Sequence, residues 1–113
     1  TNNIDNPFTP YGDASLVRQA NLFANVSQLG TEAELLRCLA WVSTESARLL
    51  RLPDYGLKPG CKADFVVFDA PSAAAVVAQI KAPSMGFKAG RQTFAREQPQ
   101  LLMPGLEVSQ RLA

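Results

Sequence analysis

The first half of the chain carries hydrophobic positions that repeat with the period of an α-helix. Between residues 14 and 28, apolar side chains such as those of Leu16, Ala20 and Phe23 are separated by a polar stripe. The stripe consists of Arg18, Asn21, Asn25 and Gln28. This pattern predicts an amphipathic helix over residues 14–28 whose polar stripe faces solvent. Asp13 is its predicted N-cap, and Gly30 its predicted C-terminal stop.

A second helix is predicted from residue 32 to residue 50. Thr31 and Glu34 have the spacing of a capping box, in which each side chain accepts a hydrogen bond from the backbone of the other residue. Hydrophobic side chains then recur on one face, and Trp41 is expected to lie in the core or to contact the rest of a barrel. Pro53 cannot donate a helical hydrogen bond and prevents the helix from continuing.

The second half of the chain predicts mostly short elements. Residues 65–68 are apolar without alternation, which is typical of a strand buried on both faces. A short helix is expected at 73–80, a hairpin at 85–94 that turns near residues 89–91, and an extended tail at 99–113. One strand and one hairpin cannot cover two amphipathic helices. The order of elements therefore predicts that the chain is a piece of a larger fold.

Composition and charge exclude several classes of function. The sequence has 113 residues, 47% of them hydrophobic, and a net charge of +1, so we expect a globular chain that binds neither nucleic acid nor membrane. It contains no histidine, which removes the commonest general base and the commonest nitrogen ligand for a metal. We see no secretory signal at Thr1 and expect a cytoplasmic protein in which Cys38 and Cys61 are free thiols. The missing initiator methionine predicts a cut from a longer chain.

Two stretches carry the most specific information. Residues 55–69 read YGLKPGCKADFVVFD and follow the helix end SARLL at 46–50, and residues 2–13 read NNIDNPFTPYGD. In this order they resemble the C-terminal end of metal-dependent amidohydrolases, in the branch that includes cytosine deaminase. The resemblance spans about residues 2–91, and each motif alone would be weak.

The resemblance implies a fold of the α/β class. The chain would be the C-terminal part of a (β/α)-barrel together with part of the small β-sandwich that flanks such barrels. Residues 1–52 would form the last barrel loop and helices, residues 53–98 the strands of the sandwich with a short helix, and residues 99–113 the extended tail.

The resemblance also implies roles for individual residues. Asn2 stands at the position of the family aspartate that binds the metal and shuttles protons, and Asn cannot accept that proton. Asn3 would contact the substrate and Phe8 would line the mouth of its pocket. Asp5 is a weak candidate to replace the missing carboxylate. We expect no metal in this chain, and Zn or Fe in the intact parent enzyme.

The main hypothesis is a C-terminal fragment of an amidohydrolase or deaminase that acts on a nitrogen heterocycle or related amide and is inactive alone. Its expected partners are the missing N-terminal part, a small-molecule substrate in the parent, and a second copy of itself. The alternative is an autonomous, non-catalytic α+β binding or oligomerisation module derived from such an enzyme. Without the family, the asparagines beside Pro7 are ordinary turn residues.

Overall fold

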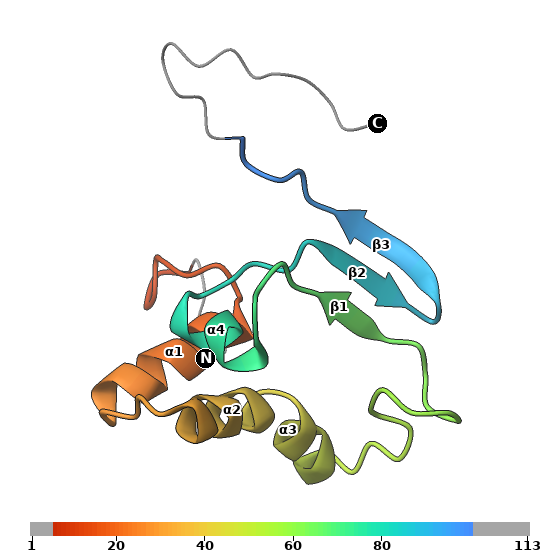
Figure 1. Cartoon of the computed structure of the whole chain (residues 1–113), viewed down its shortest axis with the longest axis horizontal. Helices are drawn as coiled ribbons and strands as arrows, with labels where there is room; N and C mark the ends of the chain where they lie inside the picture. Colours follow the sequence, from red (N-terminus) through yellow and green to blue (C-terminus); the bar gives the residue numbers. More distant parts are fainter. Residues whose placement is uncertain (1–5, 101–113) are drawn as a thin grey trace.

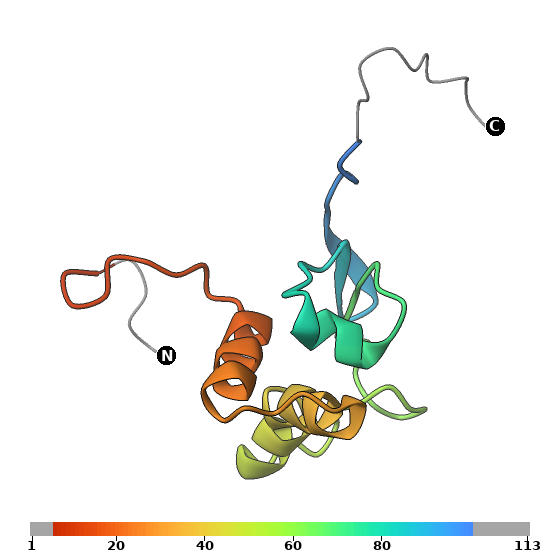
Figure 2. The same cartoon turned by 60° about the vertical axis from the view of Figure 1, so that its left-hand side comes forward.

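The computed structural model describes residues 6–100 of the chain, which combine helices with an antiparallel sheet. In chain order the elements are α1 (Leu16–Val26), α2 (Glu32–Trp41), α3 (Thr44–Leu49), β1 (Phe65–Val67), α4 (Ala73–Ala78), β2 (Met85–Lys88) and β3 (Arg91–Ala95). Helices α1, α2 and α4 gather on one side, and the sheet extends away from them toward the C-terminal end (Figure 1). Turning the view shows α4 between α1 and the sheet (Figure 2).

The hydrophobic core lies where α1, α2 and α4 meet. Ala20 and Ala24 of α1 are almost fully buried, and Cys38 of α2 and Val77 of α4 are completely buried. Two alanines one helical turn apart let the neighbouring helices approach α1 closely, because a methyl group is all that separates the backbones. Larger side chains surround this centre, namely Leu29, Leu35, Leu39 and Val42.

The sheet has the order β1-β2-β3, and both strand pairs are antiparallel. Phe65 pairs with Phe87 across β1 and β2, and their rings stack with centroids 4.7 Å apart. On the opposite face Gly86 pairs with Phe94, whose ring lies over the glycine backbone. The predicted hairpin is confirmed, and its turn holds Ala89 and Gly90 at positive φ values of 49° and 75°, as a tight two-residue hairpin turn requires.

The N-cap of the first helix lies two residues later in the chain than predicted. Ser15 is the N-cap, and its side chain accepts a hydrogen bond from the amide of Arg18. Asp13 instead accepts a hydrogen bond from the amide of Ser15. Ala14, which lies between them, has a left-handed φ of 58° that changes the direction of the backbone before the helix starts. The helix ends at Val26 with Ser27 as its C-cap, and the chain turns at Gln28, which has a left-handed φ of 54°, two residues before the predicted stop at Gly30.

The prediction of one helix from 32 to 50 is wrong, although its capping box is confirmed. Thr31 and Glu34 exchange both hydrogen bonds at the start of α2. The helix breaks after Trp41 and restarts as α3 at Thr44. Ser43 donates its hydroxyl to the carbonyl of Leu39 at 2.7 Å. Hydroxyl groups that compete for helix carbonyls in this way weaken and bend a helix.

The prediction that residues 65–68 are buried on both faces is also wrong for the described part of the chain. β1 lies at an edge of the sheet, and the side chain of Val66 is 47% exposed. Several other large apolar side chains are similarly exposed on the helices, including Leu16, Leu22, Phe23, Leu36 and Trp41. Within residues 6–100, none of the helices is both long enough and apolar enough to cross a bilayer.

Candidate functional site

The loop before α1 is built around Asn6 and presents Phe8 at its tip. The side-chain oxygen of Asn6 accepts hydrogen bonds from the amides of Phe8 and Thr9 at 2.9 and 3.0 Å. The backbones of Asn6 and Thr9 also exchange two hydrogen bonds of 3.1 Å. Asn favours such a turn because its side chain can accept from the backbone that follows, and the ring of Pro7 fixes φ at a value suitable for the next turn position. The ring of Phe8 is 90% exposed as a result.

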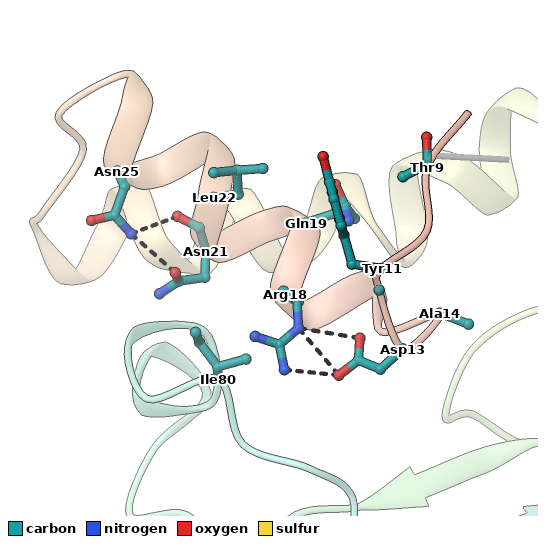
Figure 3. A pocket seen from close by; sticks show the side chains of 11 residues that line it. Thr9, Tyr11, Asp13, Ala14, Arg18, Gln19, Asn21, Leu22, Asn25 and Ile80 are labelled. Atoms are coloured by element: carbon teal, nitrogen blue, oxygen red, sulfur yellow. Dashed lines mark hydrogen bonds and ion pairs between the residues drawn. The ribbon is translucent and has the colours of Figure 1, made fainter. Parts of the chain in front are cut away.

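A cavity of about 710 Å³ lies between this loop and α1 (Figure 3). Its lining residues come from the loop, from one side of α1 and from the end of α4: Thr9, Tyr11, Gly12, Asp13, Ala14, Arg18, Gln19, Asn21, Leu22, Asn25 and Ile80. The predicted polar stripe of α1 therefore borders a concave surface. The cavity combines apolar walls with amide, hydroxyl and guanidinium groups, which is typical of sites for small polar ligands.

Asp13 and Arg18 form an ion pair at the start of this cavity. The Arg18 guanidinium donates to both carboxylate oxygens of Asp13, with a shortest distance of 2.8 Å. The hydrogen bond from Arg18, followed by that from the Ser15 amide, lowers the pKa of Asp13 to about 2. The same contact raises the pKa of Arg18. Asp13 is therefore ionised at neutral pH and too weak a base to accept a proton from water.

Asn21 fixes the cavity wall by joining α1 to α4. Its side-chain amide donates to the carbonyl of Val77 at 2.9 Å, and Asn25 in turn donates to the backbone and side-chain oxygens of Asn21. This corrects the prediction that the whole stripe faces solvent, because Asn21 satisfies a carbonyl at the end of α4. Ile80, which lines the cavity, has a φ of 49°, an uncommon and strained value for a β-branched residue.

The described residues do not fit a catalytic metal. The sequence has no histidine, and residues 6–100 contain no group of three or more carboxylate or thiol side chains close enough to share a metal ion. Asp13 is already paired with Arg18. The cavity wall can contribute hydrogen bonds and apolar contacts to a ligand, but these residues do not assemble a metal centre.

The motif at residues 55–69 has a structural role. Gly56 and Gly60 have φ values of 130° and 91°, which explains both glycines, since other residues would be strained there. Asp64 accepts hydrogen bonds from the Lys88 ammonium and from the amide of Ala89 at 2.7 Å. These two contacts, led by that from Lys88, lower the pKa of Asp64. The motif thus fastens the entry to β1 onto the turn of the β2–β3 hairpin.

Only one of the predicted site residues lies in the part of the chain that the structure describes. Asn2, Asn3 and Asp5 lie outside the described residues. Phe8 is described, but it is not part of the cavity lining in Figure 3. The sequence reasoning missed the cavity itself. The sequence signal for this cavity is the row of amide side chains on one side of α1. Helical spacing alone cannot distinguish such a row from an ordinary solvent-exposed face.

Comparison with known proteins identifies what this arrangement is similar to. Over 89% of the chain, the fold matches a quarter (25%) of 5-methylcytosine deaminase from Klebsiella pneumoniae liganded with 5-fluorocytosine, with a TM-score of 0.81 and 27% identity. It also matches N-isopropylammelide isopropylaminohydrolase from Burkholderia multivorans, with a TM-score of 0.74, 28% identity, 79% of this chain and 23% of that one. No curated protein sequence matches the chain. The sequence model of the Amidohydrolase family matches residues 3–94, which is most of the chain, and the chain therefore belongs to the Amidohydrolase family.

Proposed function

We propose that this chain is the C-terminal part of a metal-dependent amidohydrolase or deaminase that acts on a nitrogen heterocycle or a related amide. The observation that carries the proposal is the unequal coverage of the structural matches. The matches cover 79–89% of this chain but only 23–25% of the length of the two enzymes. One of these is by name a deaminase of a methylated cytosine, and the other an aminohydrolase of N-isopropylammelide.

In the proposed enzyme, α1 to α3 belong to the outer helices of a (β/α)-barrel, and the three-stranded sheet belongs to the flanking β-sandwich. The exposed apolar side chains support this assignment. Gln19, Phe23 and Trp41 border a groove of about 370 Å³ between α1 and α2 that is otherwise lined by Ala20, Cys38 and Val42. An apolar groove of this kind is covered in the stable protein, because exposed apolar area is unfavourable in water. The proposed cover is the remaining part of the same enzyme.

The proposed chemistry of the intact enzyme depends on residues outside this chain. A bound Zn or Fe ion would lower the pKa of a water molecule and so supply the nucleophile. Asn2 would stand where the family has an aspartate, and Asn3 and Phe8 would contact the substrate. The family match begins at residue 3, directly after Asn2. Because this sequence contains no histidine that could hold the metal, the chain alone is proposed to be inactive.

The autonomous binding or oligomerisation module is the less favoured alternative. The chain matches parts of enzymes, and its completely buried side chains are few among the described residues, with Val77 and Cys38 the largest. A separate module would be expected to close its own core. A single folded species of 12.2 kDa that binds no hydrophobic dye would favour this alternative.

The proposal is tested by measuring ammonia or amine release from cytosine, 5-methylcytosine and N-alkylated ammelides. The complete enzyme that contains these residues should turn over at least one of these compounds when loaded with Zn or Fe. The 113-residue chain, prepared in the same way, should turn over none of them. Turnover by the short chain, or inactivity of the metal-loaded enzyme toward the whole series, would contradict the proposal.

A further inference from the structure

The turn that carries Phe8 is closed by two residues that each precede a proline. Asn6 and Thr9 pair as an antiparallel bridge, and Pro7 and Pro10 follow them. A residue before proline favours extended conformations, because the proline ring clashes with a helical backbone at that position. The sequence therefore holds both ends of the turn in the conformation that the bridge needs.

The side chain of Asn6 fixes the tip of the turn between these two ends. Its Oδ1 accepts hydrogen bonds from the amides of Phe8 and Thr9 at 2.9 and 3.0 Å. The Thr9 amide also donates to the backbone carbonyl of Asn6, whereas within residues 6–100 the Phe8 amide donates to Oδ1 alone. An asparagine oxygen in this position takes the place of a backbone carbonyl. Removing it would take away the contact that fixes the backbone at Phe8.

The ring of Phe8 is held by this turn and not by apolar packing. Its exposed fraction is the highest among the exposed large apolar side chains of residues 6–100. A side chain that becomes ordered only on binding loses conformational freedom at that moment, and a ring that is fixed beforehand avoids much of this loss. An aromatic face also matches the flat ring of a nitrogen heterocycle, which it can contact by stacking.

From these observations we propose that Asn6 is a positioning residue of the amidohydrolase site, and that its side-chain oxygen holds Phe8 in the orientation in which the ring contacts the heterocycle. The inference rests on the proposed function, in which Phe8 contacts the substrate. Asn6 itself is assigned no contact with the reacting atoms. Because it orders a ring that binds the substrate before the reaction, its loss should weaken substrate binding and leave the chemical step unchanged.

Kinetics of the complete, metal-loaded enzyme test this role. Asn6→Ala should raise KM about tenfold and leave kcat within about twofold of the unaltered enzyme. Asn6→Asp keeps an acceptor oxygen and should stay within about threefold of the unaltered KM. Ser15→Ala is the matched control, because it removes one hydrogen bond from a side chain to a backbone amide, that of Arg18 at 3.2 Å, outside the turn. Equal rises in KM for Asn6→Ala and either of the other two variants would overturn the inference.

A double variant separates positioning of Phe8 from a general structural role. In Phe8→Ala the ring is absent, so adding Asn6→Ala should change KM by less than about twofold. If the two substitutions instead multiply their effects on KM, Asn6 acts independently of the ring, and the inference is overturned.

Hydrogen exchange in the same enzyme gives a readout that does not depend on activity. Relative to their intrinsic rates, the amides of residues 8 and 9 should exchange about fivefold faster in Asn6→Ala and at nearly the unaltered rate in Phe8→Ala. Unchanged exchange in Asn6→Ala overturns this inference and leaves the proposed function intact. An unaltered enzyme that turns over none of the heterocycles contradicts the proposed function, and with it the substrate contact that Asn6 would position.

Discussion

Replacing Val77 by alanine should destabilise the protein by removing the centre of its helical core. Val77 is completely buried in α4 and packs beside Ala20 and Ala24 of α1 and Cys38 of α2. The change deletes two methyl groups, worth about 1.6 kcal/mol in transfer free energy. The cavity that remains adds up to about 1 kcal/mol, because these neighbours are small and rigidly placed on helices. The expected loss of stability is about 2–3 kcal/mol.

Urea unfolding followed by tryptophan fluorescence measures this loss directly. Trp41 is the only tryptophan of the sequence, and its ring meets that of Phe23 edge to face with centroids 5.2 Å apart. Its emission therefore reports the contact between α1 and α2. For a chain of this size the urea dependence is about 1 kcal/mol per molar, so the midpoint should fall by roughly 2 M.

Val26→Ala is the matched control for this experiment. Val26 is the last residue of α1, is 76% exposed, and undergoes the same chemical change, so its substitution should cost less than about 0.5 kcal/mol. Equal midpoint shifts in the two variants would refute the packing of α4 on α1 and α2 as the stabilising core. A larger effect at Val26 would mean that another part of the protein buries that position.

Three further outcomes are expected. Thr31→Ala removes the hydroxyl that accepts from the Glu34 amide at 3.3 Å, and should cost about 1 kcal/mol in the same assay, whereas an unchanged midpoint would contradict a role for the capping box. Because its folded pKa is lowered from 3.8 to about 2, Asp13 should stabilise the start of α1 at all pH values above 3.8, and this contribution should disappear as the pH falls through 2. NMR titration of the Asp13 carboxyl tests this, and its midpoint should move back toward 3.8 in Arg18→Gln but not if the pair is absent in solution. In the complete enzyme, Asn2→Asp should raise deaminase activity by restoring a proton acceptor, and a loss of turnover would show that the assigned role is wrong.

Local interactions account for the features that could be predicted from the sequence. The capping box of α2, the short helix after Pro71 and the hairpin turn at Ala89 and Gly90 all depend on residues within a few positions of each other. The family resemblance rests on the same kind of local pattern. The glycines at 56 and 60 occupy conformations that few other residues adopt, so their spacing is a pattern that can be recognised in the sequence alone.

Features of the site that depend on distant partners could not be predicted in this way. Asn21 lies on a helical stripe that is equally compatible with solvent, and only the position of α4 gives its amide a carbonyl acceptor at Val77. The pairing of Asp13 with Arg18 replaced the expected N-cap because Ala14 turns the chain. Periodicity marks which side chains share a face of an element, but it carries no information about what covers that face. The exposure of Val66 and the cavity beside α1 therefore became visible only when the elements were placed in space.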